Sequence, residues 1–395
     1  MKKETFKIDN SHLLSYQNEL STEEYWQLKK EIFQIPFHHL RKIYQNSYKD
    51  EEYSAKDITP LKYYEQEKID SFYSEIGSKY YNSYAVLTLS GGSGSRFGYD
   101  GPKGTFEFTI NNKKESMFSL QALKLKKIYK ETGNYLLWVI MTSIENHDAI
   151  INYFEKNNYF DYPRENIYFF SQSELPVLNI SGQCVLKDKG HVLKASDGNG
   201  QVFKSLKTSG MLKELKKRNI LYVECINIDN ILAPLYDSSF IGLLVHHNYL
   251  VGTKTSIKEN PDTNEYVFCK YKNKPFLYNL NAIDKSFEKD SNLYQDTFLG
   301  ISLFHIKALE KLSKINLPYH RAYKHYDYIN PDKTLSSRVE KNAFKFEKFI
   351  FDGFSYFDDL LLYRIDKEKE FAPIKSQTGP NSLEEAIKKY EKYYH

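Results

Sequence analysis

Residues 84–98 read YAVLTLSGGSGSRFG, and this stretch decides the fold. Its first six residues, 84–89, form a short apolar run that stops at a cluster of glycines, as a buried strand of a parallel sheet does. In open α/β sheets, ligands bind beyond the carboxyl ends of the strands. Glycines let the backbone approach a ligand closely, and successive backbone N–H groups can then hold phosphate oxygens. The stretch therefore predicts an α/β fold with an anion-binding loop after its first strand.

The same pattern repeats farther along the chain. Apolar runs at 135–141, 167–170 and 221–228 indicate further strands, and segments with helical spacing, such as 117–128, lie between them. Strands that alternate with helices of about 10 to 15 residues are typical of βαβ units. We therefore predict an α/β fold with a Rossmann-like, mixed but mostly parallel sheet flanked by helices.

The regions on either side of this pattern differ from it in character. Residues 1–79 are polar and rich in tyrosine, with apolar residues at helical spacing, and we expect a helical N-terminal region there. The main α/β domain is expected to span 80–345, with less regular strands after residue 250. The remaining residues, 346–395, are expected to form a small C-terminal domain.

Composition excludes several classes of protein. The net charge of +4 is small for 395 residues, so nothing demands a nucleic-acid partner. No run of about 18 apolar residues predicts a membrane span, and the N-terminal MKKETFKIDN lacks the apolar run of a signal peptide. The spacing of Cys184, Cys225 and Cys269 fits no metal or disulfide pattern. We expect a cytoplasmic protein with no nucleic-acid or membrane partner, as a monomer or a weak homo-oligomer.

Two common glycine-rich nucleotide loops do not match the stretch after the first strand. A P-loop needs Lys-Ser or Lys-Thr directly after its last glycine, whereas Gly98 is followed by Tyr99. A dinucleotide fingerprint needs the spacing GxGxxG, whereas residues 92–98 give GxGxxxG. A nicotinamide-dependent dehydrogenase is therefore disfavoured.

The loop does carry two basic residues, Arg96 and Lys103. Cations beside backbone donors are what a triphosphate with roughly four negative charges requires. The alternative is a glycine-rich turn with two solvated basic residues, and the loop taken alone leaves both interpretations open.

The loop also resembles a known family signature. Residues 89–104, LSGGSGSRFGYDGPKG, are similar to the LxGGxGTRLG…PKG motif of UDP-sugar pyrophosphorylases, above all the UDP-N-acetylhexosamine pyrophosphorylase branch and its bacterial uridylyltransferase relatives. Six further blocks resemble the family in the same order over roughly residues 80–375: WVIMTS (138–143), FFSQ (169–172), DGNGQVF (197–203), IDNIL (228–232), FEKFIFD (346–352) and EFAPIK (370–375). The resemblance implies a fold of the nucleotide-diphospho-sugar transferase type.

The resemblance also implies a reaction. UMP would pass from UTP to a sugar 1-phosphate, either an N-acetylhexosamine or a hexose 1-phosphate, which gives a UDP-sugar and pyrophosphate. Such a transfer depends mainly on positioning and on charge neutralisation. The expected partners are therefore UTP and the sugar 1-phosphate.

Roles follow for the residues that match the family blocks. Arg96, Lys103 and Lys375 are expected to act on the phosphates as catalytic residues. Asp229 is expected to hold Mg²⁺, a hard cation that prefers oxygen ligands and bridges phosphates. The residues expected to bind the nucleotide or the nearby sugar are Gly91, Gly92, Gln172, Gly198 and Asn199.

The sequence departs from the family at positions expected to face the sugar. Phe298 stands where relatives carry an asparagine, and Leu277 and Leu280 stand where they carry two acidic residues. These replacements remove hydrogen-bond partners for sugar hydroxyls, so the acceptor need not be N-acetylglucosamine 1-phosphate. They also keep open an alternative: a non-catalytic protein that binds UTP or a UDP-sugar through a degenerate sugar site.

Overall fold

The computed structural model describes residues 10–46, 54–94, 98–258, 266–279, 294–336 and 340–394. The chain forms two compact units. The larger is made of residues 52–172, 202–316 and 350–395, and the smaller of residues 1–51, 173–201 and 317–349. Each unit is described by itself below.

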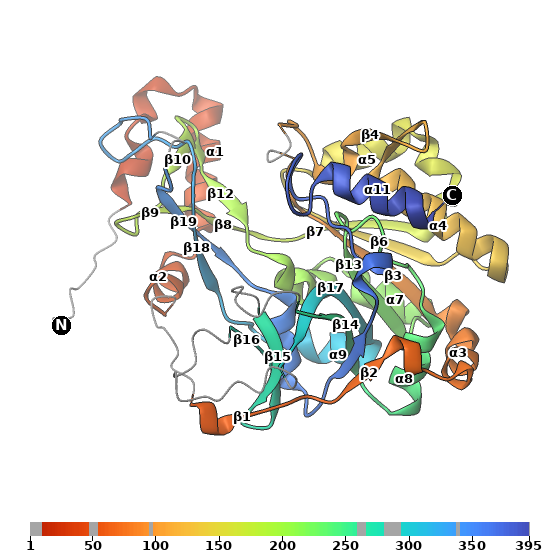
Figure 1. The fold of residues 1–395 in the computed structure, drawn as a ribbon. Coiled ribbons are helices and arrows are strands. Elements are labelled where there is room, and N and C mark those ends of the chain that lie inside the picture. Colours follow the sequence, from red (N-terminus) through yellow and green to blue (C-terminus); the bar gives the residue numbers. More distant parts are fainter. Residues whose placement is uncertain are drawn as a thin grey trace. The chain divides into compact units, whose positions relative to one another are not determined.

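A mixed sheet forms the centre of the larger unit (Figure 1). Its main path runs in the order β2-β20-β14-β17-β13-β3-β6-β7, and all neighbours are parallel except at β17, which is antiparallel to both β14 and β13. The bounds of these strands, in chain order, are β2 Tyr63–Glu65, β3 Tyr84–Ser90, β6 Leu137–Thr142, β7 Ile167–Ser171, β13 Tyr222–Asn227, β14 Val251–Ile257, β17 Asp296–His305 and β20 Leu361–Arg364. The predicted mixed, mostly parallel α/β sheet is therefore confirmed.

The register brings the carboxyl ends of four strands to one edge. Ser90 of β3 pairs with Thr142 of β6, and Thr142 pairs with Ser171 of β7. On the other side of β3, Asn227 of β13 pairs with Leu89. Every residue of β3 and of β6 is buried, which is why both strands read as continuous apolar runs rather than as alternating ones.

Helices pack on the sheet because their apolar stripes need cover. α4 (Met117–Thr132) starts at a capping box between Ser116 and Ser119 and ends at Gly133, whose φ of 72° suits glycine. α4 packs in one buried cluster with sheet residues such as Trp138, together with residues of α5 (His147–Lys156), α8 (Ser238–His246) and α11 (Leu383–Tyr393). Other α-helices among the described residues of this unit are α3 (Ser71–Gly77), α6 (Val202–Thr208), α7 (Met211–Lys217), α9 (Ile306–Leu312) and α10 (Lys367–Glu370).

Short strands extend the larger unit. β15 (Tyr266–Tyr271) pairs with β17 at Val267, with β1 (Ile58–Thr59) and with β16 (Lys274–Asn279). A separate hairpin joins β4 (Glu107–Ile110) to β5 (Lys113–Ser116). β1 and β2 belong to the N-terminal region that we expected to be helical, which also contains α3 and so has both kinds of element.

The smaller unit has its own core. α1 (Thr22–Gln34) begins at a capping box between Ser21 and Glu24 and, with α2 (Phe37–Asn46), packs on buried residues such as Leu178 and Phe346. The strands of this unit are β8 Glu174–Pro176, β9 Leu178–Asn179, β10 Leu186–Asp188, β11 His191–Val192, β12 Lys194–Ser196, β18 His320–Lys324 and β19 Ala343–Glu347. β19 pairs with both β18 and β9.

The two compact units do not coincide with the three sequence segments that we predict. The smaller unit gathers residues from three distant stretches, and β20 places part of 346–395 in the main sheet. The physical reason is that non-local strand pairing leaves no mark in the local sequence pattern.

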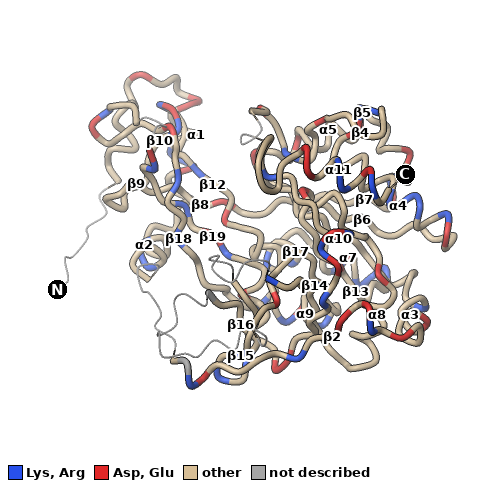
Figure 2. The backbone as a smooth tube through the Cα atoms, in the orientation of Figure 1, with Lys and Arg blue, Asp and Glu red and all other residues tan. Residues whose placement is uncertain are grey.

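The structure shows how the charged residues, the apolar helices and the cysteines are distributed. Figure 2 shows Lys and Arg interspersed with Asp and Glu along the described backbone. Within the described ranges, no helix is both long enough and apolar enough to cross a membrane. The three cysteines are buried free thiols.

Candidate active site

The glycine loop after β3 folds back on itself. The amide of Gly94 donates to the carbonyl of Gly101 at 2.8 Å, and the amide of Lys103 donates to the carbonyl of Gly92 at 3.0 Å. These hydrogen bonds bring Lys103 back to the end of the strand from which the loop started. Arg96 lies outside the described residues, so its role stays a prediction.

Lys103 forms an ion pair with Asp229. The ammonium nitrogen lies 2.8 Å from Oδ2 of the carboxylate, and the two side chains are only 14% and 16% exposed. Asp229 follows β13, and Lys103 belongs to the loop after β3, the neighbouring parallel strand. The structure therefore brings together the expected phosphate-binding cation and the expected metal-binding carboxylate at one edge of the sheet.

Gln172 lies directly against Gly91. Its backbone amide donates to the carbonyl of Thr142 at 2.9 Å, which fixes it at the end of β7. A methyl group on Gly91 would lie 2.2 Å from Nε2 of Gln172, so only glycine fits there without a shift. A methyl group on Gly92 would meet no atom within 4 Å. The side chain of Gln172 therefore packs against Gly91, whereas the space next to Gly92 is open.

The side chain of Gln172 is poorly satisfied. Gln172 is only 5% exposed, and its Oε1 is buried without a hydrogen-bond partner among the described residues. Leaving a buried acceptor unpaired costs about 1–3 kcal/mol. Such a group needs an explanation, and a ligand that donates a hydrogen bond is one.

The segment that carries Lys375 runs beside Asp229. The amide of Ile374 donates to the carbonyl oxygen of Asp229 at 2.9 Å, and an isolated bridge pairs Asn230 with Pro373. The amide of Lys375 donates to the carbonyl of Asn381 at 2.8 Å, and the Lys375 residue is exposed. Lys375 is therefore one residue away from a direct backbone contact with Asp229.

Gly198 and Asn199 form a tight turn inside the smaller unit. Gly198 has a φ of 90°, and a methyl group there would lie 2.4 Å from the carbonyl oxygen of Lys348. The amide of Gly200 donates to the same carbonyl at 2.9 Å. Only glycine can adopt this conformation so close to another backbone segment. Their expected contacts with the nucleotide stay predictions.

Phe298 belongs to an aromatic cluster. Its ring centroid lies 6.1 Å from that of Phe268, 5.9 Å from that of Phe351 and 6.0 Å from that of Phe354. Leu277 is 7% exposed and pairs with Phe268 across β15 and β16. Leu280 lies outside the described residues. Phe298 and Leu277 thus stand in apolar surroundings where relatives are expected to carry polar side chains.

Sequence reasoning missed one polar group near this cluster. A methyl group on Gly300, whose φ is 75°, would lie 2.5 Å from Nδ2 of Asn227. Asn227 ends β13, two residues before Asp229. It lies inside the apolar run at 221–228, and its polar side chain near the end of that run is the signal that singles it out.

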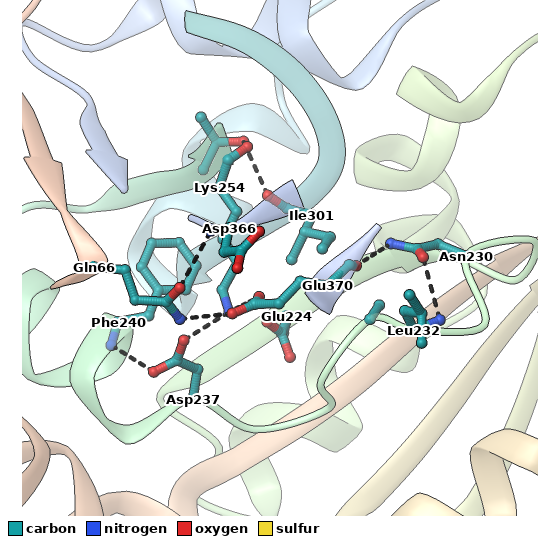
Figure 3. A network of polar contacts seen from close by, with 12 residues as sticks. Gln66, Glu224, Asn230, Leu232, Asp237, Phe240, Lys254, Ile301, Asp366 and Glu370 are labelled. Atoms are coloured by element: carbon teal, nitrogen blue, oxygen red, sulfur yellow. Dashed lines mark hydrogen bonds and ion pairs between the residues drawn. The ribbon is translucent and has the colours of Figure 1, made fainter. Parts of the chain in front are cut away.

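A network of buried polar side chains includes Glu224 of β13, Lys254 of β14 and Glu370 of α10 (Figure 3). The Lys254 ammonium group is fully buried and contacts Asp237 and Glu370, each at 2.6 Å. Although burial lowers the pKa of Lys254, the two carboxylates together raise it above its usual value. Burial raises the pKa of Glu224 to about 7, against the opposing effect of Lys254. Lys254 is thus a permanent cation at the centre of the network.

Comparison with known proteins identifies the family. The model of a family described as UTP–glucose-1-phosphate uridylyltransferase matches residues 34–379. The chain is 29% identical to the "Probable UDP-N-acetylglucosamine pyrophosphorylase" of Dictyostelium discoideum, over 96% of this chain and 84% of that one. It is 30% identical to the UDP-N-acetylglucosamine pyrophosphorylase of Saccharomyces cerevisiae, over 75% of this chain and 65% of that one.

A solved structure gives the same result. The fold is similar to that of the uridine diphosphate N-acetylglucosamine pyrophosphorylase from Trypanosoma brucei, with a TM-score of 0.77 and 25% identity. That similarity covers 97% of this chain and 82% of the other. The family match spans most of the chain, and it includes the residues described at the edge of the sheet. The chain therefore belongs to the UDP-sugar pyrophosphorylase family of nucleotidyltransferases.

Proposed function

We propose that this protein transfers UMP from UTP to a sugar 1-phosphate. An oxygen of the sugar 1-phosphate attacks the α-phosphorus of UTP, the bond from that phosphorus to the β-phosphate oxygen breaks, and pyrophosphate leaves. The observation that carries the proposal is the Lys103–Asp229 ion pair beside Gly91 and Gln172, at the edge where four strands end.

The nucleotide side of the site supports a uracil base. An amide side chain offers both a donor and an acceptor, and the imide edge of uracil carries an N–H and two carbonyls. The buried Oε1 of Gln172 would accept from that N–H, and Nε2 would donate to a carbonyl. Gly91 and Gly92 are proposed to complete the nucleotide contacts of the larger unit. Contacts of Gly198 and Asn199 with the nucleotide or sugar stay predictions from the family resemblance.

Lys103 supports charge stabilisation during transfer. Negative charge builds up on pyrophosphate as the bond to the α-phosphorus breaks, and an ammonium group held in place stabilises it without reorganisation. Lys103 is held by a loop that is hydrogen-bonded to its own start, and its side chain is mostly buried. Arg96 and Lys375 are proposed to contact the same phosphates.

The residues present fit a divalent cation. Magnesium is usually held by one or two carboxylates together with substrate phosphates, and Asp229 supplies such a carboxylate. Within the described residues, no group of three or more His, Cys, Asp and Glu side chains could hold a metal ion alone. We therefore propose Mg²⁺ that arrives with UTP, with Asp229 as its protein ligand; when bound, it neutralises phosphate charge.

The acceptor is proposed to be an N-acetylhexosamine or hexose 1-phosphate. The names of the relatives support N-acetylglucosamine 1-phosphate as the first candidate. The apolar surroundings of Phe298 and Leu277 support an acceptor that makes fewer hydrogen bonds on this side. We also propose a cytoplasmic location, which is compatible with three buried free thiols.

A single assay tests the function. The full chain is incubated with UTP, Mg²⁺ and each of N-acetylglucosamine, N-acetylgalactosamine, glucose and galactose 1-phosphate, and pyrophosphate release is measured. We expect release with at least one sugar and none without sugar. Folded protein that binds UTP by calorimetry but releases no pyrophosphate with any of them would support the non-catalytic alternative instead.

A further inference from the structure

The side chain of Asn230 attaches the segment from Glu370 to Lys375 to the turn after β13, in addition to the backbone hydrogen bond from Ile374 to Asp229. Asn230 donates from Nδ2 to the carbonyl oxygen of Glu370 at 2.9 Å and accepts at Oδ1 from the amide of Ala372, also at 2.9 Å. The same Oδ1 accepts from the amide of Leu232 at 3.3 Å. Asn230 is 4% exposed, so these bonds form away from water. The side-chain amide of Asn230 therefore both donates to and accepts from one backbone segment, as the peptide groups of a strand residue do.

The far end of this attachment is fixed by charge. The Glu370 carboxylate accepts from Lys254 at 2.6 Å and from Nε2 of Gln66 at 2.7 Å, so both of its oxygens are paired (Figure 3). Lys254 is held in turn by Asp237, which also caps α8 by accepting from the amide of Phe240. Removing one member of a buried charged group is strongly destabilising, so these contacts favour the position that Glu370 has in the structure.

The network connects two predicted site residues that are far apart in sequence. Asn230 follows Asp229 directly, and Glu370 lies five residues before Lys375. The amide of Ile374 closes the attachment by donating to the carbonyl of Asp229 at 2.9 Å. Any shift of this segment would therefore change the distance between Lys375 and the Asp229 carboxylate.

We propose that Asn230 and Glu370 are positioning residues, which hold the 370–375 segment beside Asp229 so that Lys375 reaches the phosphates that Asp229 and Lys103 engage. This inference rests on the proposed function, because it assigns a purpose to Lys375 in that reaction. Misplacing a catalytic group by about 1 Å can cost on the order of 100-fold in rate. The network would act through kcat rather than through UTP binding.

A double-mutant cycle tests this role. Asn230→Ala should lower kcat by about 10- to 100-fold and change the KM for UTP by less than about threefold. If Asn230 acts through Lys375, the double variant with Lys375→Ala should be no slower than the slower single variant. Losses that multiply instead would overturn the proposal, because Asn230 would then act independently of Lys375.

Asn342 offers a matched control. Its Nδ2 donates to the carbonyl of Tyr326 at 2.7 Å, and its Oδ1 accepts from the amide of Tyr326 at 2.9 Å, so it makes the same kind of pair in the smaller unit. Asn342→Ala should reduce stability but leave kcat within about twofold of wild type. An equal loss of kcat in the Asn230 and Asn342 variants would show a general stability effect and overturn the proposal.

Two further measurements keep the test decisive. Asn230→Ser, which keeps a small polar side chain, replaces Asn230→Ala in the cycle if that variant does not fold, and Glu370→Gln weakens the anchor at its other end. Hydrogen exchange of the 370–382 region does not depend on turnover, and it should become at least about tenfold faster in either variant but not in Asn342→Ala. Unchanged exchange overturns the proposal. If the wild-type protein shows no turnover, the proposed function alone is wrong. Hydrogen exchange then still tests whether Asn230 holds the segment.

Discussion

The ammonium group of Lys103 lies 2.8 Å from a carboxylate oxygen of Asp229, although 126 residues separate them in sequence. Each of these groups is expected to engage UTP, the cation through phosphate oxygens and the carboxylate through Mg²⁺. Without substrate they neutralise each other, so neither charge lies unpaired in a mostly buried position. When the magnesium nucleotide binds, Lys103 would contact phosphate oxygens in place of Asp229, and Asp229 would contact Mg²⁺ in place of Lys103.

Lys103→Ala should lower kcat by about 100- to 1,000-fold, because it removes charge stabilisation in the transition state. It should also lower the stability, since Asp229 loses its ion-pair partner, while the overall fold is kept. The measurement is pyrophosphate release at saturating UTP, with circular dichroism to verify folding. Lys114→Ala, which removes an exposed ion pair with Glu107, is the control and should remain active. Near wild-type turnover of the Lys103 variant would show that its assigned role is wrong.

Asp229→Asn should raise the Mg²⁺ concentration needed for half-maximal rate by at least about tenfold, because the amide is a weaker ligand for a hard cation. The rate is followed during a Mg²⁺ titration at fixed UTP. Asp358→Asn changes an exposed carboxylate of the same unit that pairs with Lys274, and it should leave the titration unchanged. A parallel shift in both variants would contradict a specific role for Asp229.

Gln172→Leu should weaken UTP binding by about tenfold or more without loss of stability, since it removes a buried acceptor that has no described partner. Calorimetry measures the affinity and thermal unfolding measures the stability. Gln121→Leu is the matched control: Gln121 is equally buried, but its Oε1 accepts from Thr88 at 2.9 Å. The control should keep its UTP affinity. The opposite outcome would mean that Gln172 serves packing rather than the base.

Stability should fall as pH rises from about 4.5 to about 7, because of Glu224. Burial raises the pKa of this carboxyl group to about 7, so the folded state binds the proton more tightly than the unfolded chain does. The free energy of unfolding should therefore decrease over that window by about 3 kcal/mol from this group. Glu224→Gln, which cannot ionise, should remove this part of the pH dependence.

Tryptophan fluorescence can report this effect for the larger unit alone. The chain has two tryptophans, and Trp26 belongs to the smaller unit whereas Trp138 lies in the main sheet. In a Trp26→Phe background, urea unfolding at pH 4.5 and pH 7.5 follows Trp138. If the parent and Glu224→Gln proteins show the same pH dependence, the Glu224 carboxyl group does not titrate as its burial implies.

Much of the fold could be predicted from sequence because it depends on local patterns. The runs at 84–89 and 167–170 match β3 and β7 closely. Every residue of β3 is buried, which explains its continuous apolar run, whereas β7, at the end of the sheet path, is fully buried only at Ile167 and Phe170. The position of the glycine loop followed from the rule that ligands bind beyond the carboxyl ends of strands, whereas the roles of Gln172 and Asp229 came from the family resemblance. The assembly of the smaller unit from three stretches was not predictable, because each stretch alone has only short strands and ordinary helices.

The sequence by itself determined the family, the parallel core of the sheet and the identity of the candidate residues, because motif blocks and apolar runs are local and keep their order along the chain. Only the tertiary structure decided the pairing of Lys103 with Asp229, the closure of Gly91 by Gln172 and the attachment of the 370–375 segment through Asn230. These contacts join residues that are between 81 and 142 positions apart. Hydrogen bonds and ion pairs at such separations depend on how strands and loops pack in three dimensions, and no periodicity in the chain records them.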